Sequence, residues 1–416
     1  MRPRTVVTLV VVLGLLSAGV GAVLLQDGGL TLSERWVSDT GTDIRANHHP
    51  VAAGSVAGEG VVYAPISGAG GTGECRLAAL HAGNGSLRWE HGVPPANCTL
   101  HAVADPAIAD ADGDGTAEVY AASTTDELLG FHARTGAVEF RETLSEYGFT
   151  RPVVADVTGD ERPEIAVVDV TGTLFVYAPD GTLRWERDLD GITNGAPQAG
   201  DFTGDGTTEL AVGTGADEAV LLEGNGTTVW SRNTWDEAVG WTTSGQVDDD
   251  PAREFVVATT EGTVGVLDGR TGEVQWHADL GTLAAVHAFG DGDDDGEPEL
   301  YAGAADNRLR AFDAASGEQE WATTLTTGDT QMMPPPLLGD ADGDGDPEVV
   351  AATNDGLVSV VDPATGEVLA TYGRERPIYT HPTLADTDGD GADELYVIYG
   401  DGRVVALDAT RPAGSA

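Results

Sequence analysis

The chain has 416 residues, of which 69 are acidic and 21 are basic, and each of the 21 is an arginine. A net charge of −48 argues against nucleic acid as a partner, because phosphates would be repelled. Since 41 % of the residues are hydrophobic and alternate regularly with polar ones, we expect a folded core and not a disordered acidic chain. The even spread of charge predicts adaptation to very high salt, as in a haloarchaeon, where a Debye length of about 3 Å screens self-repulsion.

The N-terminal segment 1–25 indicates export. Arg2 and Arg4 precede an uncharged apolar run at 5–25. This length suits either a signal peptide or an uncleaved membrane anchor. Positively charged residues that flank an apolar segment stay in the cytoplasm, so we expect the rest of the chain to be extracytoplasmic, at the cell surface. It would be either secreted or anchored through residues 5–25.

A nine-residue acidic motif recurs along the chain, and its copy at 340–348 has carboxylates at positions 1, 3, 5 and 9 and glycine at position 6. Carboxylates at alternate positions of a tight loop direct oxygens toward a common centre, and the glycine permits the sharp turn. Without a cation they would repel at about 4 kcal/mol per close pair at an effective dielectric near 20. A plain Asp-Gly hairpin turn would need only one such residue pair. The pattern therefore predicts calcium, with these ligands in the four full copies: Asp110, Asp112, Asp114, Glu118, Asp291, Asp293, Asp295, Glu299, Asp340, Asp342, Asp344, Glu348, Asp386, Asp388, Asp390 and Glu394.

Three further copies depart from the full pattern. Two of them have threonine at position 3, and we expect weaker calcium sites there. The copy at 246–254 begins with Gln246 and has Pro251 in place of glycine, so we expect no metal in it. The candidate ligands of the two weaker sites are Asp156, Asp160, Glu164, Asp201, Asp205 and Glu209.

The motif repeats in steps of 45 to 49 residues, which indicates a repeat architecture. Each period contains a short inner strand, the acidic loop and three more strands, which is the size of one β-propeller blade. The last period is one strand short, and the segment 30–36 resembles the fourth strand of other periods. We therefore expect an all-β, eight-bladed β-propeller at 26–410, closed by an N-terminal strand that completes the C-terminal blade, and a disordered tail at 411–416.

The repeats resemble known families. The segments 311–321 and 266–276 each combine an aspartate, a Ser-Gly or Thr-Gly turn and a tryptophan, and they are similar to the tryptophan-docking repeat of pyrroloquinoline-quinone-type propellers, including the outer-membrane assembly lipoprotein. The acidic loops resemble the FG-GAP repeats of integrin α-subunits and of bacterial VCBS proteins, although position 9 is glutamate here and aspartate there. The resemblance implies that tryptophans pack structurally between neighbouring blades. The residues concerned are Trp89, Trp185, Trp230, Trp276 and Trp321.

Two classes of function are compatible with such a propeller. The first is a non-catalytic binding or scaffolding protein, monomeric, with a surface protein or glycan as its partner. The second is a quinoprotein dehydrogenase, whose family members have adjacent cysteines, a basic residue at the quinone and long insertions. Here Cys75 and Cys98 lie apart, lysine is absent and most blades are minimal. The sequence therefore favours the binding protein, with calcium as its only cofactor and no catalytic residue.

The two cysteines are expected to pair. Cys75 follows a long connection within the first blade, and Cys98 lies in the link that leaves this blade. Both connections emerge on one face, and an extracytoplasmic compartment is oxidising, so we predict a disulfide. Two free buried thiols are the alternative.

The partner is expected on the face opposite the acidic loops. Acidic loops and Thr-Gly turns share one face, where one chemistry is repeated, whereas the links between blades vary. Aromatic and arginine residues at such links indicate a binding surface around the mouth of the central channel. Integrin-like adhesion through the acidic loops is the alternative. The predicted partner-binding residues are His49, Asp105, Arg151, Trp241 and His381.

Overall fold

The computed structural model describes residues 29–411 except 42–44, 68–74, 99–101 and 249. The expected signal or anchor at 1–25 and residues 412–416 of the expected tail lie outside this part. The described residues form thirty-two strands and no helix. Within them, no helix is long and apolar enough to span a membrane.

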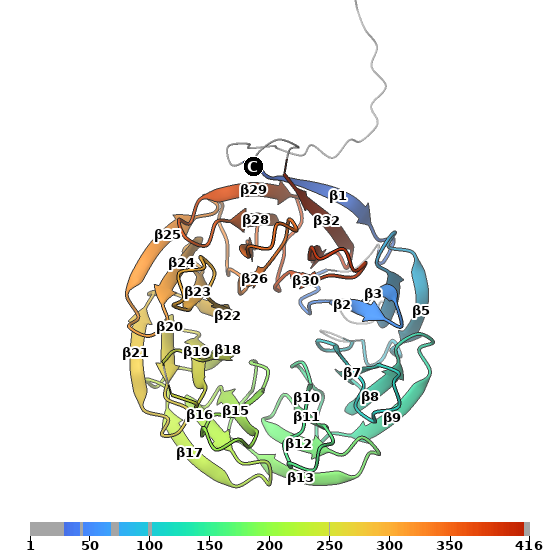
Figure 1. Ribbon diagram of the computed structural model, residues 1–416. Helices are drawn as coiled ribbons and strands as arrows, with labels where there is room; N and C mark the ends of the chain where they lie inside the picture. The colour runs from blue at the N-terminus through green and yellow to red at the C-terminus, as the bar shows by residue number, and fades with distance from the viewer. Residues whose placement is uncertain (1–28, 42–44, 68–74, 99–101, 249, 412–416) are drawn as a thin grey trace, which may run out of the picture.

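The strands form eight four-stranded antiparallel sheets arranged as a ring (Figure 1). This arrangement confirms the predicted eight-bladed propeller. The first four blades contain β2 (Ala52–Val56), β3 (Glu59–Ile66), β4 (Arg76–His81) and β5 (Leu87–Gly92); β6 (Ala107–Ala109), β7 (Glu118–Ser123), β8 (Glu127–His132) and β9 (Val138–Thr143); β10 (Val153–Ala155), β11 (Glu164–Val168), β12 (Thr173–Tyr177) and β13 (Leu183–Asp188); and β14 (Gln198–Gly200), β15 (Glu209–Thr214), β16 (Glu218–Leu222) and β17 (Thr228–Asn233).

The remaining blades follow the same order, with the inner strand first. They contain β18 (Val239–Gly245), β19 (Glu254–Thr259), β20 (Thr263–Leu267) and β21 (Val274–Asp279); β22 (Ala284–Gly290), β23 (Glu299–Ala304), β24 (Arg308–Asp313) and β25 (Gln319–Thr324); β26 (Leu337–Gly339), β27 (Glu348–Ala352), β28 (Leu357–Val361) and β29 (Val368–Gly373); and β30 (Thr383–Ala385), β31 (Glu394–Ile398), β32 (Val404–Thr410) and β1 (Thr31–Val37).

The ring is closed by the two ends of the chain. The eighth sheet has the order β1-β32-β31-β30, with Thr31 opposite Thr410 and Val37 opposite Val405. In Figure 1 the blue strand β1 lies against the red strand β32. The predicted N-terminal strand is thus the outer strand of the C-terminal blade, so backbone hydrogen bonds between the two chain ends hold the ring shut.

The hydrophobic core lies between blades. In seven blades the second strand is buried along its whole length, as in β7, whereas the outer strand mixes exposed and buried side chains, as in β9. Side chains of neighbouring blades form shared clusters: Tyr120 and Ala122 of the second blade pack with Ile165 and Val167 of the third. Each blade is therefore stabilised mainly by its two neighbours.

Tryptophans of the outer strands fix these junctions. The indole N–H of Trp276 donates to the carbonyl oxygen of Ala314 in the next blade at 2.6 Å. Its ring covers Gly317, whose φ is +72° and where an added Cβ would lie 2.5 Å from the indole. The structural role implied by the resemblance is confirmed at all five predicted tryptophans, and Trp36 of the closing blade has the same contact. The six donors are Trp36, Trp89, Trp185, Trp230, Trp276 and Trp321.

Every outer strand also contains a one-residue β-bulge, which directly precedes the aromatic residue in seven blades and Ala370 in the seventh blade. In β25, Trp321 lies opposite Ala311 and Gln319 lies opposite Phe312, so Glu320 is the extra residue. A bulge of this kind redirects a side chain away from the regular alternation of the strand. The eight extra residues, called bulge residues below, are Arg88, Glu139, Arg184, Val229, Gln275, Glu320, Leu369 and Arg35.

Candidate functional site

The acidic motifs fold as tight loops between the first two strands of a blade. In the copy after β6, the carboxylate of Asp110 accepts hydrogen bonds from the N–H groups of Gly113 and Gly115, both at 2.9 Å. The buried carboxylate of Glu118 accepts from the N–H of Ala111 at 3.2 Å. These bonds curl the loop around its first residue, so the side chains at positions 1, 3 and 9 converge.

The convergence fits a calcium ion. In at least five of the loops, three carboxylates each offer an oxygen, and the three oxygens lie within 4.8 Å of one another. Calcium binds six to eight oxygen ligands, which carboxylates and backbone carbonyls supply. A bound ion would neutralise the mutual repulsion of these carboxylates. The groups are Asp110, Asp112 and Glu118; Asp201, Asp205 and Glu209; Asp248, Asp250 and Glu254; Asp291, Asp293 and Asp295; and Asp340, Asp342 and Asp344.

The glutamate at position 9 is buried in each of these loops. Burial, together with the charges of Asp342 and Asp344, raises the pKa of Glu348 to about 7. Burial raises the pKa of Glu299 to about 7 and that of Glu118 to about 6. Without a cation, these carboxylates therefore take up protons at about pH 6 to 7, above the ordinary range of glutamate, whereas a bound cation would favour the ionised form.

We expect the contribution of Glu299 to the stability of the metal-free protein to be lost between about pH 4.5 and pH 7. The folded pKa of Glu299, about 7, exceeds its ordinary value of 4.5, so its contribution is present below the ordinary value and lost as the pH rises. Melting temperatures measured in chelator from pH 5 to pH 8 check this. Calcium should suppress the loss, and Glu299→Gln should reduce it in chelator. If the metal-free wild type and Glu299→Gln show the same pH dependence, the prediction is contradicted.

The loop at 340–348 contains an arginine from another blade. The guanidinium of Arg411, which follows β32, pairs with the carboxylates of Asp342, of Asp344 at 2.9 Å and of Glu348 at 3.2 Å. Arg411 was expected in a disordered tail, and it is instead the cation partner of three predicted calcium ligands. The negative charge of this loop is therefore partly offset without metal.

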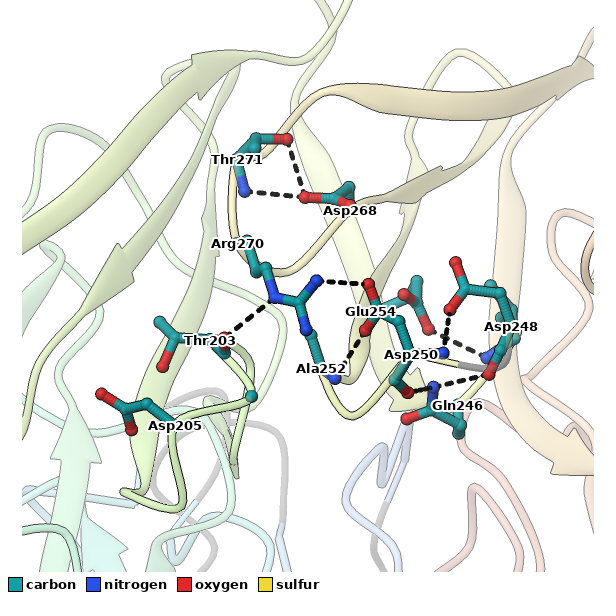
Figure 2. A network of polar contacts seen from close by, with 12 residues as sticks. Thr203, Asp205, Gln246, Asp248, Asp250, Ala252, Glu254, Asp268, Arg270 and Thr271 are labelled. Carbon is teal, nitrogen blue, oxygen red and sulfur yellow. Dashed lines mark hydrogen bonds and ion pairs between the residues drawn. The ribbon is translucent and has the colours of Figure 1, made fainter.

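The imperfect loop at 246–254 also has an arginine (Figure 2). Arg270, in the turn between β20 and β21, donates from Nη1 to Asp250 Oδ2 at 2.6 Å. Its Nε donates to the backbone carbonyl of Thr203 in the neighbouring loop at 3.0 Å. Gln246 donates to the backbone carbonyl of Asp248 at 2.7 Å. The side chain of Arg270 thus bridges two adjacent loops, and a cation of the protein itself stands beside the loop in which we expected no metal.

The central channel forms a cavity of about 560 Å³ at the beginning of the inner strands. Of the five residues predicted to bind a partner, four line this cavity: Asp105, Arg151, Trp241 and His381. His49 does not belong to the lining that the structure describes. It is 1 % exposed and its Nδ1 lies 2.6 Å from Asp105 Oδ1. The prediction of His49 as a surface residue is therefore wrong, since it packs behind Asp105 and orients this carboxylate.

The cavity also contains His287, which the sequence interpretation missed. The preceding residue, Val286, is fully buried, and a bulge follows it in the pairing with β23. The sequence signal that could have identified His287 is its position as a polar residue near the start of an inner strand. The imidazole centroids of His287 and His381 lie 5.4 Å apart. Asn194 and Gln198 complete the polar lining.

Burial controls the charges at this mouth, defined here as Asp105, Arg151, Trp241, His287 and His381. Burial lowers the pKa of both histidines to about 4, so both imidazoles are neutral near pH 7. Burial raises the pKa of Asp105 to about 6, although His381 and Arg151 oppose the shift. Arg151 is thus the permanent cation of the mouth, beside a carboxylate that titrates close to neutrality.

Cys75 and Cys98 form a disulfide, with their Cα atoms 5.6 Å apart. Both residues are 1 % exposed and pack in one apolar cluster with Leu77 and Val93. The bond ties the third strand of the first blade to the link that leads into the second blade. It has no part in the acidic loops or the mouth.

Comparison with known proteins identifies the repeat. A family model described as outer membrane protein assembly factor BamB matches residues 148–284 and 216–413, which together make up more than half of the chain. No curated protein matches the sequence. BamB from Moraxella catarrhalis is similar in structure, with 16 % identity, a TM-score of 0.62 and coverage of 91 % of this chain and 99 % of that one.

Two other solved propellers show the same fold. The biofilm matrix protein Bap1 of V. cholerae has 15 % identity and a TM-score of 0.69, with 93 % of this chain and 92 % of that chain covered. The quinohemoprotein alcohol dehydrogenase ADHIIG from Pseudomonas putida HK5 has 14 % identity and a TM-score of 0.63, with 92 % and 77 % covered. At such identities the likeness is one of fold alone. Because the repeat model matches from the third blade to the last, the chain belongs to the BamB-like family of PQQ-type repeat propellers.

Proposed function

We propose that this chain is a non-catalytic, calcium-stabilised binding or scaffolding propeller that works outside the cytoplasm and engages a surface protein or glycan. The observation that carries the proposal is the mouth, where an arginine, an indole and a titratable carboxylate share one cavity. It lies at the opposite end of the inner strands from the acidic loops: Asp105 precedes β6, and Asp110 follows it. The repeated loops then stabilise the ring, and the varied residues of the mouth select the partner.

The family supports this role. Its model is described as an assembly factor of the outer membrane, which is a protein-binding and extracytoplasmic role in its own setting. Calcium as a stabilising ion is supported by the carboxylate oxygens that converge in the loops. We expect each site to be weak, with a dissociation constant of about 10⁻⁴ to 10⁻³ M, as in other extracellular modules.

Substitutions at the mouth should weaken partner binding. Arg151→Ala and Trp241→Ala should each raise Kd at least about tenfold, because arginine and tryptophan anchors typically contribute 2 kcal/mol or more. The partner would be captured from the native membrane by affinity purification, and its binding measured at constant high salt. Charge reversals at Glu273 and Glu367, beside the Thr-Gly turns of the other face, are the controls. If these reversals weaken binding and the mouth variants do not, the partner engages the face with the acidic loops.

A quinoprotein dehydrogenase is the second candidate, favoured by the cavity at the channel and by the fold shared with the quinohemoprotein alcohol dehydrogenase. The disulfide joins cysteines 23 residues apart, unlike the adjacent pair expected for such enzymes. Incubation of the purified protein with pyrroloquinoline quinone and calcium separates the two candidates. Cofactor absorbance that stays with the protein, together with alcohol oxidation, would favour the enzyme.

A further inference from the structure

We propose that a charged bulge residue on an outer strand decides, by its sign, which cation completes the acidic loop of the same blade. An arginine supplies a built-in cation and makes the loop independent of calcium, whereas a glutamate adds a further carboxylate and commits the loop to a divalent cation. The proposal rests on the calcium binding proposed above. Loops of similar sequence thus fall into two classes, and the residue that separates the classes lies outside the nine-residue motif.

The third blade shows the arginine class. Its bulge residue, Arg184, lies in β13, and the guanidinium approaches Asp160 at 3.5 Å and Glu164 at 3.7 Å. These are positions 5 and 9 of the loop at 156–164, two of the predicted calcium ligands. Glu164 is buried. A guanidinium is permanently charged, so it offsets the charge of these carboxylates at any pH of interest.

The closing blade repeats the arrangement with a strand from the other end of the chain. Arg35 of β1 pairs with Glu394 at 3.2 Å and with Asp388 at 3.7 Å. A third contact, with Asp408 at 2.7 Å, holds the guanidinium in place. The loop at 386–394 is a full copy of the motif, so its sequence alone placed it among the strongest calcium sites.

Two other blades show that bulge residues reach this turn in general. In the first blade, whose turn lacks the motif, Arg88 Nη2 pairs with Glu59 Oε2 at 2.5 Å. In the fifth blade, Gln275 Nε2 donates to Asp248 Oδ2 at 3.3 Å. The contact therefore follows from the geometry of the bulge and not from the presence of an arginine.

The sixth blade shows the opposite class. Its bulge residue, Glu320, occupies the same register position in β25 as Arg184 in β13 and Arg35 in β1. The second blade has Glu139 at this register position in β9. Among the described residues, no arginine pairs with the acidic loop of either blade. A fifth negative charge raises the repulsion that only a bound cation relieves.

The seventh blade has a neutral bulge residue and takes its cation from elsewhere. Leu369 contacts the apolar cluster of the last two blades and offers no charge. The cation comes instead from Arg411, which pairs with the loop at 340–348. Loops with a built-in cation thus occur at 156–164, 246–254, 340–348 and 386–394, and those with a bulge glutamate at 110–118 and 291–299.

The test determines the number of bound calcium ions from the dependence of protein stability on calcium concentration. The slope of the unfolding free energy against the logarithm of free calcium concentration is proportional to the number of saturated sites. We expect Arg184→Glu and Arg35→Glu each to raise the slope by the contribution of one site. Glu320→Arg should lower the slope by one site. Arg88→Glu is the matched control, since its blade lacks the acidic motif, and its slope should equal that of the wild type.

Milder variants keep the test decisive if charge reversal prevents folding. Arg184→Gln should gain calcium dependence because the loop loses its own cation, and Glu320→Gln should weaken but not abolish the calcium response of its loop. A calcium-dependent wild type whose slope is unchanged in both Arg184→Gln and Glu320→Arg overturns this inference alone. A wild type whose stability does not respond to calcium overturns both the inference and the calcium part of the proposed function.

Discussion

Replacing Trp276 with alanine should lower the free energy of unfolding by about 3 to 5 kcal/mol, the range for truncating a buried aromatic side chain. The indole is 8 % exposed, and its centroid lies 5.9 Å from that of Phe312 in the next blade. Its N–H bond to Ala314 would also be lost, which leaves a carbonyl without its donor. Unfolding in guanidinium chloride at constant total salt and calcium measures the change.

Two controls separate packing from hydrogen bonding at this junction. Trp276→Phe retains a ring but no donor, so it should cost less than the alanine variant. Gly317→Ala changes the other side of the contact: the added Cβ would meet the indole at 2.5 Å, at a φ of +72° that disfavours alanine, and we expect a loss of about 1 to 3 kcal/mol. If Trp276→Ala unfolds like the wild type, the tryptophan does not hold the blades together.

Removal of the disulfide should have the next largest effect. The bond closes a loop of about 24 residues, so its loss should lower the free energy of unfolding by about 3 kcal/mol in the chain-entropy model. Comparison of the double variant Cys75→Ala, Cys98→Ala with the oxidised wild type checks this value. The buried sulfurs also fill an apolar cluster, so reduction of the wild-type protein gives the cleaner measurement.

A labelling experiment tests the bond itself. Thiol reagents added to the unfolded, unreduced protein should find no reactive group, because both cysteines are paired. Two reactive thiols per chain would contradict the disulfide. The single variant Cys98→Ala is the control, since it must expose one thiol at Cys75. Its stability should resemble that of the double variant, because either substitution breaks the same bond.

The features that the sequence determined by itself are local or periodic. An acidic loop is set by nine consecutive residues, so the convergence of Asp110, Asp112 and Glu118 could be expected from their spacing. The number of blades followed from the period, and the closing strand followed from the similarity of 30–36 to other outer strands. Hydrophobic alternation is set within one strand, and the period is set by the distance between successive motifs along the chain. Both can therefore be recognised in the sequence without knowledge of the fold.

Only the tertiary structure decided how the loops differ and which residues face the channel. Arg35 contacts Glu394, which is 359 positions away in the sequence, and Arg411 contacts Asp342, which is 69 positions away. No local sequence pattern predicts these contacts. A β-bulge turns Arg184 toward its loop, and another separates buried Val286 from channel-lining His287. His49 packs behind Asp105 although both precede inner strands. Register and blade packing set these directions, because a shift of one residue along a strand turns a side chain to the opposite face.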